Sequence, residues 1–313
     1  MTSLAPNRAR LTGIMFCLVG SAVLSINDVA IKSLSETYAL HQVILVRALI
    51  GLALLALIMG ASGADFRQLV TRRPGGQVLR VGFVMVSNVT YFLGLAALPL
   101  AEAVALAFIS PLLVTMLSVL VLGEQVGPRR WAAVGVGMVG VVVMLRPGGE
   151  VFQPAALLVL ISAFCYALTH MMTRRMRETE STFALNFYVQ IGFVIVSGAM
   201  GLWAGDGHLA GSGDASVAFL FRDWIWPTTA DWPAFLATGV SVAVGGMMLA
   251  QAYRTNEAAL IAPFEYVAMP LAIVWGVAVF GTWPDTLSWV GIGLICGSGL
   301  YVFWREAVKK VTP

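Results

Sequence analysis

The sequence predicts an all-α polytopic membrane protein in which ten transmembrane helices form two inverted five-helix repeats around a central cavity. Composition, the spacing of apolar segments and an internal repeat support this prediction. Hydrophobic residues make up 59% of the 313 residues, charged residues make up 11%, and the mean hydropathy is +0.86. Soluble domains carry about 25% charged residues. A soluble fold of this composition would lack the polar residues needed to cover its surface.

Ten apolar segments are each about long enough to cross a bilayer core, which takes roughly 20 residues in a helix. Helices are required because lipid cannot hydrogen-bond to backbone N–H and C=O groups. The first segment is longer than the apolar core of a cleaved signal peptide, so we interpret it as a retained span. The predicted spans cover residues 11–33, 40–59, 77–97, 101–121, 129–146, 153–173, 183–204, 232–254, 258–280 and 285–304.

The charges of the loops predict the orientation. With a cytoplasmic N-terminus, the outer segments contain only Lys32, Arg146 and Arg222 as cations. The cytoplasmic segments then contain Arg8, Arg10, Arg67, Arg72, Arg73, Arg80, Arg129, Arg130, Arg174, Arg175, Arg177, Arg254, Arg305, Lys309 and Lys310. Because cytoplasmic loops are enriched in Lys and Arg, we expect a bacterial inner-membrane protein with both termini in the cytoplasm.

An internal repeat divides the chain into residues 11–146 and 153–304. Trp131 and Trp289 are separated by 158 residues, as are Gly135 and Gly293. In the first part of each copy, SINDVAIKSLSET (25–37) aligns with ALTHMMTRRMRET (167–179). Each copy has an odd number of predicted spans, so the second copy is inserted upside down. Inverted repeats place a binding site near the midplane and support alternating access, which indicates a transporter.

Polar and aromatic residues occur in predicted spans 1–4 and 6–9 and avoid spans 5 and 10. This distribution predicts a moderately polar cavity surrounded by eight helices. Without a cluster of buried Lys and Arg, the cavity suits a small neutral or zwitterionic metabolite better than a phosphorylated one. The candidate substrate-binding residues are Asn27, Asp28, His41, Arg47, Asn88, Tyr91, Ser110, Tyr166, His170, Tyr188, Gln190, Gln251, Glu265, Tyr266 and Trp275.

Two ionisable residues lie at matching depths in spans 1 and 2. Asp28 is about five residues from the outer end of its span and Arg47 about seven, and a helix rises about 1.5 Å per residue. Charged groups at such depth need a partner or a function. Two interpretations remain open: a structural ion pair between the spans, or a cavity-facing group that binds a substrate charge. His170 and Glu265 could also titrate, so proton coupling stays open.

Prolines interrupt both copies at similar places. Pro111 lies within span 4, and Pro263 and Pro270 lie in span 9. Each removes a helical hydrogen bond and kinks its helix. The freed carbonyls can bind ligand, or neighbouring helices can satisfy them. We therefore expect these prolines to act in kinking or gating.

Spans 5 and 10 are rich in glycine and nearly free of polar groups. GVGMVG matches a dinucleotide-binding pattern by letter, but it lies within an apolar run and follows no strand, so we reject that interpretation. Small residues allow close helix packing, and these spans could also form a homodimer surface. The predicted outer loop, residues 205–231, contains SVAFLFRDWIWP, which suits an interfacial helix or a re-entrant lid.

These motifs resemble the drug/metabolite transporter superfamily, in its EamA group. The first copy carries ISPLLVTMLSVLVLGEQVGPRRW, and the resemblance covers essentially the whole chain. The second copy departs from the pattern, since its hinge reads FGTWPD and Thr282 replaces the counterpart of Glu124. The resemblance implies transport of small metabolites, most often export of amino acids, aromatic or otherwise neutral. PFEY (263–266) is similar to members that take up S-adenosylmethionine or riboflavin, which is the alternative.

Other classes of function lack their motifs. An intramembrane enzyme would need a nucleophile–base pair, two carboxylates or a metal cluster at one depth, and the three histidines lie on different faces. Cys17, Cys165 and Cys296 all lie in apolar runs and are expected to be small packing residues. We expect no cofactor, no metal and no nucleic-acid partner. The expected partners are a small-molecule substrate and the lipid bilayer.

Overall fold

The computed structural model describes residues 4–122, 127–145, 154–211, 213–256 and 261–309, and the regular structure of this part is helical throughout. Six helices are long and apolar enough to cross a membrane. They are α1 (Leu4–Leu34), α2 (Leu40–Ser62), α3 (Pro74–Ala97), α7 (Ala155–Arg175), α8 (Thr182–Ala204) and α10 (Trp232–Thr255). The described chain is therefore a polytopic membrane protein, as the sequence predicts.

The remaining apolar helices are shorter, and two predicted spans are broken. The span predicted at 101–121 consists of α4 (Leu100–Ala107) and α5 (Ser110–Leu122), with Pro111 as the second residue of α5. The span predicted at 258–280 begins as a 3₁₀ helix, η2 (Ala262–Val267), which contains Pro263, and continues as α12 (Ala268–Phe280). Proline cannot donate the backbone hydrogen bond of a helix interior. Ten complete crossings remain a prediction.

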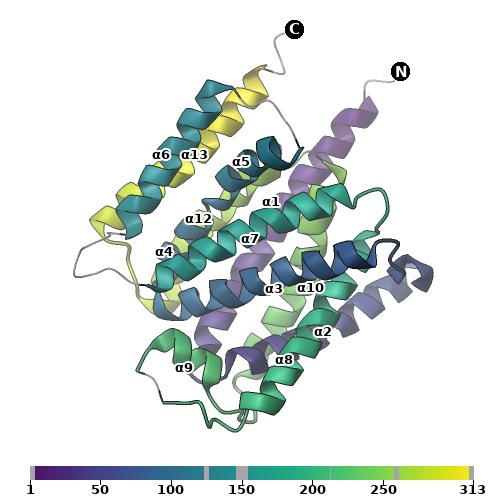
Figure 1. Ribbon diagram of the computed structural model, residues 1–313, viewed down its shortest axis with the longest axis vertical. Helices are drawn as coiled ribbons and strands as arrows, with labels where there is room; N and C mark the ends of the chain where they lie inside the picture. Colours follow the sequence, from purple (N-terminus) through teal and green to yellow (C-terminus); the bar gives the residue numbers. More distant parts are fainter. Residues whose placement is uncertain (1–3, 123–126, 146–153, 212, 257–260, 310–313) are drawn as a thin grey trace.

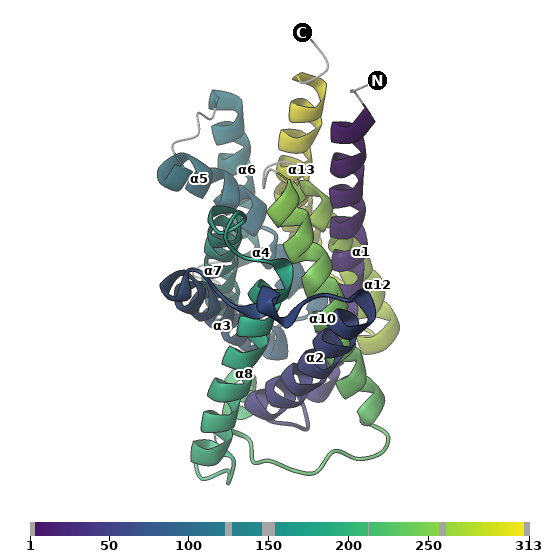
Figure 2. The same ribbon diagram turned by 90° about the vertical axis from the view of Figure 1, so that its right-hand side faces the viewer.

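Each major packing contact joins one helix from each half of the chain. α1 packs against α10, α3 against α7, and α2 against α8. α4 packs against α12, and α6 (Pro128–Leu145) packs against α13 (Thr286–Lys309). α6 and α13 lie side by side at the edge of the bundle (Figures 1 and 2). The halves are thus interleaved rather than separate.

Small residues bring α6 and α13 together. A Cβ atom on Gly140 would lie 3.0 Å from the carbonyl oxygen of Gly291, and one on Gly291 would lie 3.1 Å from that of Gly140. A Cβ atom added to Gly135, Gly293 or Gly297 would have no neighbouring atom within 4 Å. The glycine-rich spans therefore combine a tightly packed face with an outward face. The predicted hinge residues Gly123 and Glu124 lie outside the described residues.

The segment predicted as an outer loop folds against the ends of three helices. It contains a short helix, α9 (Ala215–Phe221), whose Ser216 donates a 2.7 Å hydrogen bond to the carbonyl of Leu93 in α3. Arg222 donates to the carbonyl of Ser35 just after α1, at 2.7 Å, and Gln42 of α2 donates to Ile225, at 2.5 Å. α9 lies at the opposite end of the molecule from the start of α1 and the end of α13 (Figure 1).

A buried carboxylate binds the start of α3. Glu180 follows α7, is 2% exposed, and accepts hydrogen bonds from the Thr71 hydroxyl, the backbone N–H groups of Arg72 and Arg73, and the Gln77 side chain. These bonds range from 2.9 to 3.1 Å. The bonds fix the segment that leads into α3, and a carboxylate near a helix N-terminus is favourable for the helix dipole.

Candidate functional site

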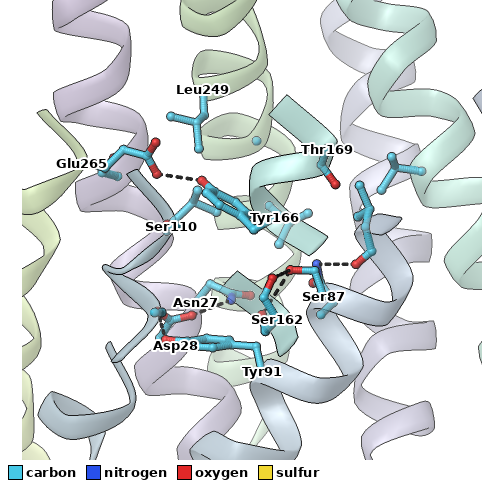
Figure 3. Close-up of a pocket in the computed structure, with 18 of the residues that line it drawn as sticks. Asn27, Asp28, Ser87, Tyr91, Ser110, Ser162, Tyr166, Thr169, Leu249 and Glu265 are labelled. Carbon is cyan, nitrogen blue, oxygen red and sulfur yellow. Dashed lines mark hydrogen bonds between the residues drawn. The ribbon is translucent and has the colours of Figure 1, made fainter. Parts of the chain in front are cut away.

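A cavity of about 280 Å³ lies among helices from both halves of the chain. Its walls come mainly from α1 and α10 on one side and α3 and α7 on the other, with α2, α8, α4 and η2 completing them. Figure 3 shows two polar layers: Glu265 and Tyr166 lie above, and Asn27, Asp28 and Tyr91 lie below. Between these layers the wall includes Ser87 and Ser162, whose hydroxyls are 3.1 Å apart.

The lower layer is built around the Asp28 carboxylate. Tyr91 of α3 donates its hydroxyl proton to one carboxylate oxygen at 3.0 Å, and the Asn27 amide donates to the other at 3.3 Å. The Asp28–Tyr91 bond therefore connects α1 to α3 across the cavity. Lys32, one turn further along α1, donates to the carbonyls of Leu95 and Leu98 at the end of α3, at 2.8 and 2.6 Å. Lys32, which the count of loop charges places among the cations of the outer segments, therefore binds a helix terminus.

Arg47 of α2 enters the same region and is only 1% exposed. One guanidinium nitrogen donates to the Asn88 side chain at 3.1 Å, while Phe92 and Phe193 lie 5.3 and 5.0 Å from the guanidinium carbon. Arg47 and Asp28 form no ion pair with each other in the described structure, because each binds other groups. Both residues line the cavity. The described structure therefore contains no closed ion pair between these two residues, and binding of a substrate charge by either of them stays a prediction.

The upper layer is built around Glu265 in η2. Tyr166 of α7 donates to one carboxylate oxygen at 2.7 Å, and Tyr253 of α10 donates to the other. His170 stacks on Tyr253, with ring centroids 3.8 Å apart, and meets Tyr166 edge-on at 4.2 Å. The Tyr166–Glu265 bond connects α7 to η2 across the cavity. Each layer therefore places a carboxylate against at least one tyrosine hydroxyl from another helix.

A second arginine lines the cavity, and its position corrects our interpretation of a loop charge. Arg80 was counted among the cytoplasmic loop cations, but it lies inside α3 and is 6% exposed. Its Nε donates to the Thr173 hydroxyl at 2.8 Å, and Nη1 donates to the Leu185 carbonyl at 2.9 Å. The predicted span 77–97 includes Arg80, but the count of loop charges assigned its charge to the cytoplasmic side, whereas the structure places the side chain in the cavity wall.

Ten of the predicted residues line the cavity: Asn27, Asp28, Arg47, Asn88, Tyr91, Ser110, Tyr166, His170, Gln190 and Glu265. Five others lie elsewhere. His41 packs near Trp224, with ring centroids 5.7 Å apart, and Tyr188 packs against Phe187, at 5.6 Å. Gln251 accepts a bond from Thr182, Tyr266 donates to the Phe108 carbonyl, and Trp275 donates to Ser25. Trp275 therefore supports the cavity wall from behind, through a serine that lines it.

The candidate set omitted several polar cavity residues: Ser21, Ser25, Arg80, Ser87, Ser162, Thr169, Thr173 and Asn186. Helical spacing could have identified some of them. In α7, Ser162, Tyr166, Thr169 and Thr173 are separated by four, three and four residues, which places them on one helix face. Once Tyr166 and His170 are taken as cavity residues, this spacing predicts the others.

Five polar atoms on cavity residues are buried without a hydrogen-bond partner in the described structure. They are the Ser21 hydroxyl oxygen, the side-chain carbonyl oxygens of Asn27 and Gln190, Nε of Arg47 and Nε2 of His170. Buried polar groups are almost always hydrogen-bonded to protein, water or ligand. The cavity therefore has free donors and acceptors that a polar solute can bind.

A bundle of apolar helices around a polar cavity defines a membrane protein that binds small solutes. The chain belongs to the EamA-like transporter family, within the drug/metabolite transporter superfamily: the sequence model of this family matches residues 11–146 and again residues 153–304. Its class is therefore that of transporters and not of enzymes.

Curated relatives are transporters with different substrates. A riboflavin transporter of Rhizobium johnstonii is 28% identical over 243 residues, which cover 78% of this chain and 74% of that protein. An S-adenosylmethionine uptake transporter of Rickettsia prowazekii is 25% identical over 95% of this chain and 94% of its own length. The pseudopaline exporter CntI of Pseudomonas aeruginosa is 25% identical over 91% and 93%. A solved crystal structure covers 96% of this chain, with a TM-score of 0.69 and 21% identity, and shows the same fold.

Proposed function

We propose that this protein is a secondary transporter that moves small metabolites across the bacterial inner membrane by alternating access. The observation that carries the proposal is the cavity, which lies among helices from both halves of a membrane-embedded bundle and has one polar layer from each half. In alternating access, parts of the bundle rock against each other around a central site. The Asp28–Tyr91 and Tyr166–Glu265 bonds are the contacts that such rocking would exchange.

The proposal includes ten spans in two inverted repeats, with both termini in the cytoplasm. The helix pairs support it, since α1–α10 and α7–α3 are equivalent pairings of the first helix in one repeat with the third in the other. The loops that follow the first helix of each repeat also support the proposal, because each of them binds the segment before the third helix of the other repeat. In the alignment that places Thr37 on Thr179, Tyr38 corresponds to Glu180, which binds the segment before α3. Tyr38 binds Asp231 at 2.6 Å and the Thr228 N–H at 3.2 Å, and both of these precede α10.

Export of amino acids is the first substrate hypothesis. The cavity combines carboxylates, arginines and aromatic rings, which suits a zwitterion with an apolar part. Its volume of about 280 Å³ is slightly below the range of about 300–1,000 Å³ for pockets that hold drug-sized ligands. Uptake of S-adenosylmethionine or riboflavin is the second hypothesis, and the names of the curated relatives favour it.

The test is transport by purified protein in sealed liposomes without ATP. Labelled amino acids, S-adenosylmethionine and riboflavin would be loaded on one side, and exchange and net flux would be measured against protein-free liposomes. Saturable movement of at least one solute is expected. If none of these solutes crosses faster than in empty liposomes, the proposal fails. Melting temperatures measured beforehand with the same solutes would select those that bind, because a ligand of the folded state raises its stability.

We also propose that two copies pair through the outward faces of α6 and α13. Gly135, Gly293 and Gly297 leave open space on these faces, and small residues allow helices to approach closely in membranes. Light scattering of the purified protein–detergent complex measures the protein mass directly. A single-chain mass at all protein concentrations would refute the pairing.

A further inference from the structure

Two buried arginines line the cavity, and their surroundings differ. Arg80 donates through Nε and Nη1 to protein oxygens, so its position is explained by the fold. Arg47 makes one side-chain hydrogen bond, to Asn88, and its buried Nε has no partner in the described structure. The fold therefore accounts for Arg80 and leaves a buried donor of Arg47, a cavity-lining residue, without a partner in the described structure.

The surroundings of Arg47 hold the guanidinium in place without neutralising it. Phe92 and Phe193 lie near it at 5.3 and 5.0 Å, which limits its movement and excludes water. Asn88, its hydrogen-bond partner, is an uncharged amide. The Asp28 carboxylate, which could have neutralised the charge, instead accepts hydrogen bonds from Tyr91 and Asn27. A buried cation without a contacting anion is unfavourable, so a bound anion at this site would be strongly stabilised.

Guanidinium groups bind carboxylates through two parallel N–H···O bonds. The free Nε and the adjacent Nη atoms can supply this arrangement. Asn88 and Tyr91 are three residues apart on α3, so the groups that they hold, Arg47 and Asp28, occupy neighbouring parts of the wall. A negative charge beside the anion site disfavours a doubly charged phosphate. It favours a solute whose carboxylate has a positive group close by.

We propose that Arg47 binds a carboxylate of the transported solute, with Asp28 facing a neighbouring cationic group of the same solute. This inference rests on the proposed transport function and narrows it to carboxylate-bearing zwitterions. The unpartnered side-chain carbonyl oxygens of Asn27 and Gln190 accept the remaining N–H or O–H groups of the solute. Gln190 lies beside this site, since its side chain packs against Gly51, one turn from Arg47 on α2.

The test measures the affinity of the full-length protein in detergent for carboxylate-bearing solutes and for the matched carboxamides. The probes are the amino acids, S-adenosylmethionine and their carboxamides, together with riboflavin, which has no carboxylate. We expect the wild-type protein to bind at least one carboxylate probe tenfold or more tightly than its carboxamide. Arg47→Gln should reduce this ratio to near one, and Arg47→Lys should restore part of it. The wild-type comparison needs no variant, so it stands even where a substitution impairs folding.

Arg222→Gln is the matched control, because Arg222 lies outside the cavity lining and donates to the carbonyl of Ser35. It should lower the melting temperature, because it removes a bond internal to the protein, while the ratio of carboxylate to carboxamide affinity stays as in the wild-type protein. Equal affinity for the two forms, or binding of riboflavin alone, overturns the role of Arg47 but leaves the transport function standing. If no solute crosses in the liposome assay, the transport function itself fails.

Discussion

Glu180 provides a direct test of how the two halves hold each other. Replacement of Glu180 by alanine removes an acceptor from four donors at the start of α3, three on one carboxylate oxygen and one on the other. The donors belong to residues more than 100 positions away in the sequence. We therefore expect the substitution to loosen the contact between the α7–α8 loop and the start of α3.

The expected magnitude follows from the burial of the carboxylate. A hydrogen bond to a charged group contributes about 1.5–3 kcal/mol, but bonds that share one acceptor are not additive. Removal of one partner from a buried charged network costs about 3–5 kcal/mol, which we take for Glu180→Ala. Glu180→Gln retains one acceptor oxygen. The side-chain carbonyl oxygen of Gln77 is buried and unpartnered in the described structure. If the Gln77 amide rotates by about half a turn, this oxygen can accept a hydrogen bond from the new amide of the Glu180→Gln variant. We expect about 1–2 kcal/mol for this variant.

The assay is thermal unfolding of the full-length protein in detergent. The readout is the fraction of protein that stays monodisperse at each temperature. A loss of 3–5 kcal/mol corresponds to a decrease in melting temperature on the order of 10 °C. Glu178→Gln is the matched control, because Glu178 lies two residues away with a side chain that is 82% exposed. We expect the control variant to be the most stable, Glu180→Gln to be less stable, and Glu180→Ala to be the least stable. If the alanine variant melts together with the control, the reasoning about this network is wrong.

Three further perturbations test other contacts. Lys32→Met removes the ammonium that binds two carbonyls at the end of α3 and should cost about 2 kcal/mol in thermal unfolding. Gly140→Leu places a Cβ atom 3.0 Å from a main-chain oxygen of α13 and should reduce the yield of monodisperse protein severalfold. Hydrogen bonds from Thr228 and Tyr38 hold the pKa of Asp231 below its ordinary value. Its contribution to stability is therefore present above pH about 4 and is lost as the pH falls through the lowered pKa. Tyr38→Phe should make stability less dependent on pH between about 5 and 3.

Each of these predictions has its own control or contrary result. Lys32→Arg should recover part of the stability, and a methionine variant as stable as the wild-type protein would show that the carbonyls gain nothing from the ammonium. Gly135→Leu, on the same helix but in open space, should leave the yield unchanged. An unaltered acid unfolding profile for Tyr38→Phe would contradict the assigned cause of the Asp231 shift.

Much of the fold can be predicted from the sequence, because lipid permits few solutions. Apolar runs locate the six long helices, and the prolines at 111 and 263 mark the two broken segments. The repeat suggests helices related in pairs. Their contacts depend on side-chain shape, as at Gly140 and Gly291, where the absence of a Cβ atom on either residue lets α6 and α13 approach closely. Hydropathy carries no information about such shape, which is why the sequence identifies helices better than neighbours.

The site could be predicted in part for a related reason. Polar residues deep in apolar runs, such as Asp28 and Glu265, stand out because their presence there is unfavourable without a function or a partner. Arg80 and Glu180 lie at the borders of apolar or charged runs, where the sequence looks like an ordinary loop. Their burial depends on contacts with distant segments. Tyr188 shows the converse, since a polar aromatic residue in a span can pack among its neighbours without reaching the cavity.

The interleaving of the halves has a consequence for biosynthesis. α3 emerges from the ribosome well before α7, so during this interval Arg80 and Ser87 meet the translocon or lipid instead of their final partners in the second half. A nascent chain that stops after α6 lacks α10 and α7, the main packing partners of α1 and α3. We therefore expect the first half alone to lack the packing that completes the fold, and the bundle to close only once the later helices have inserted.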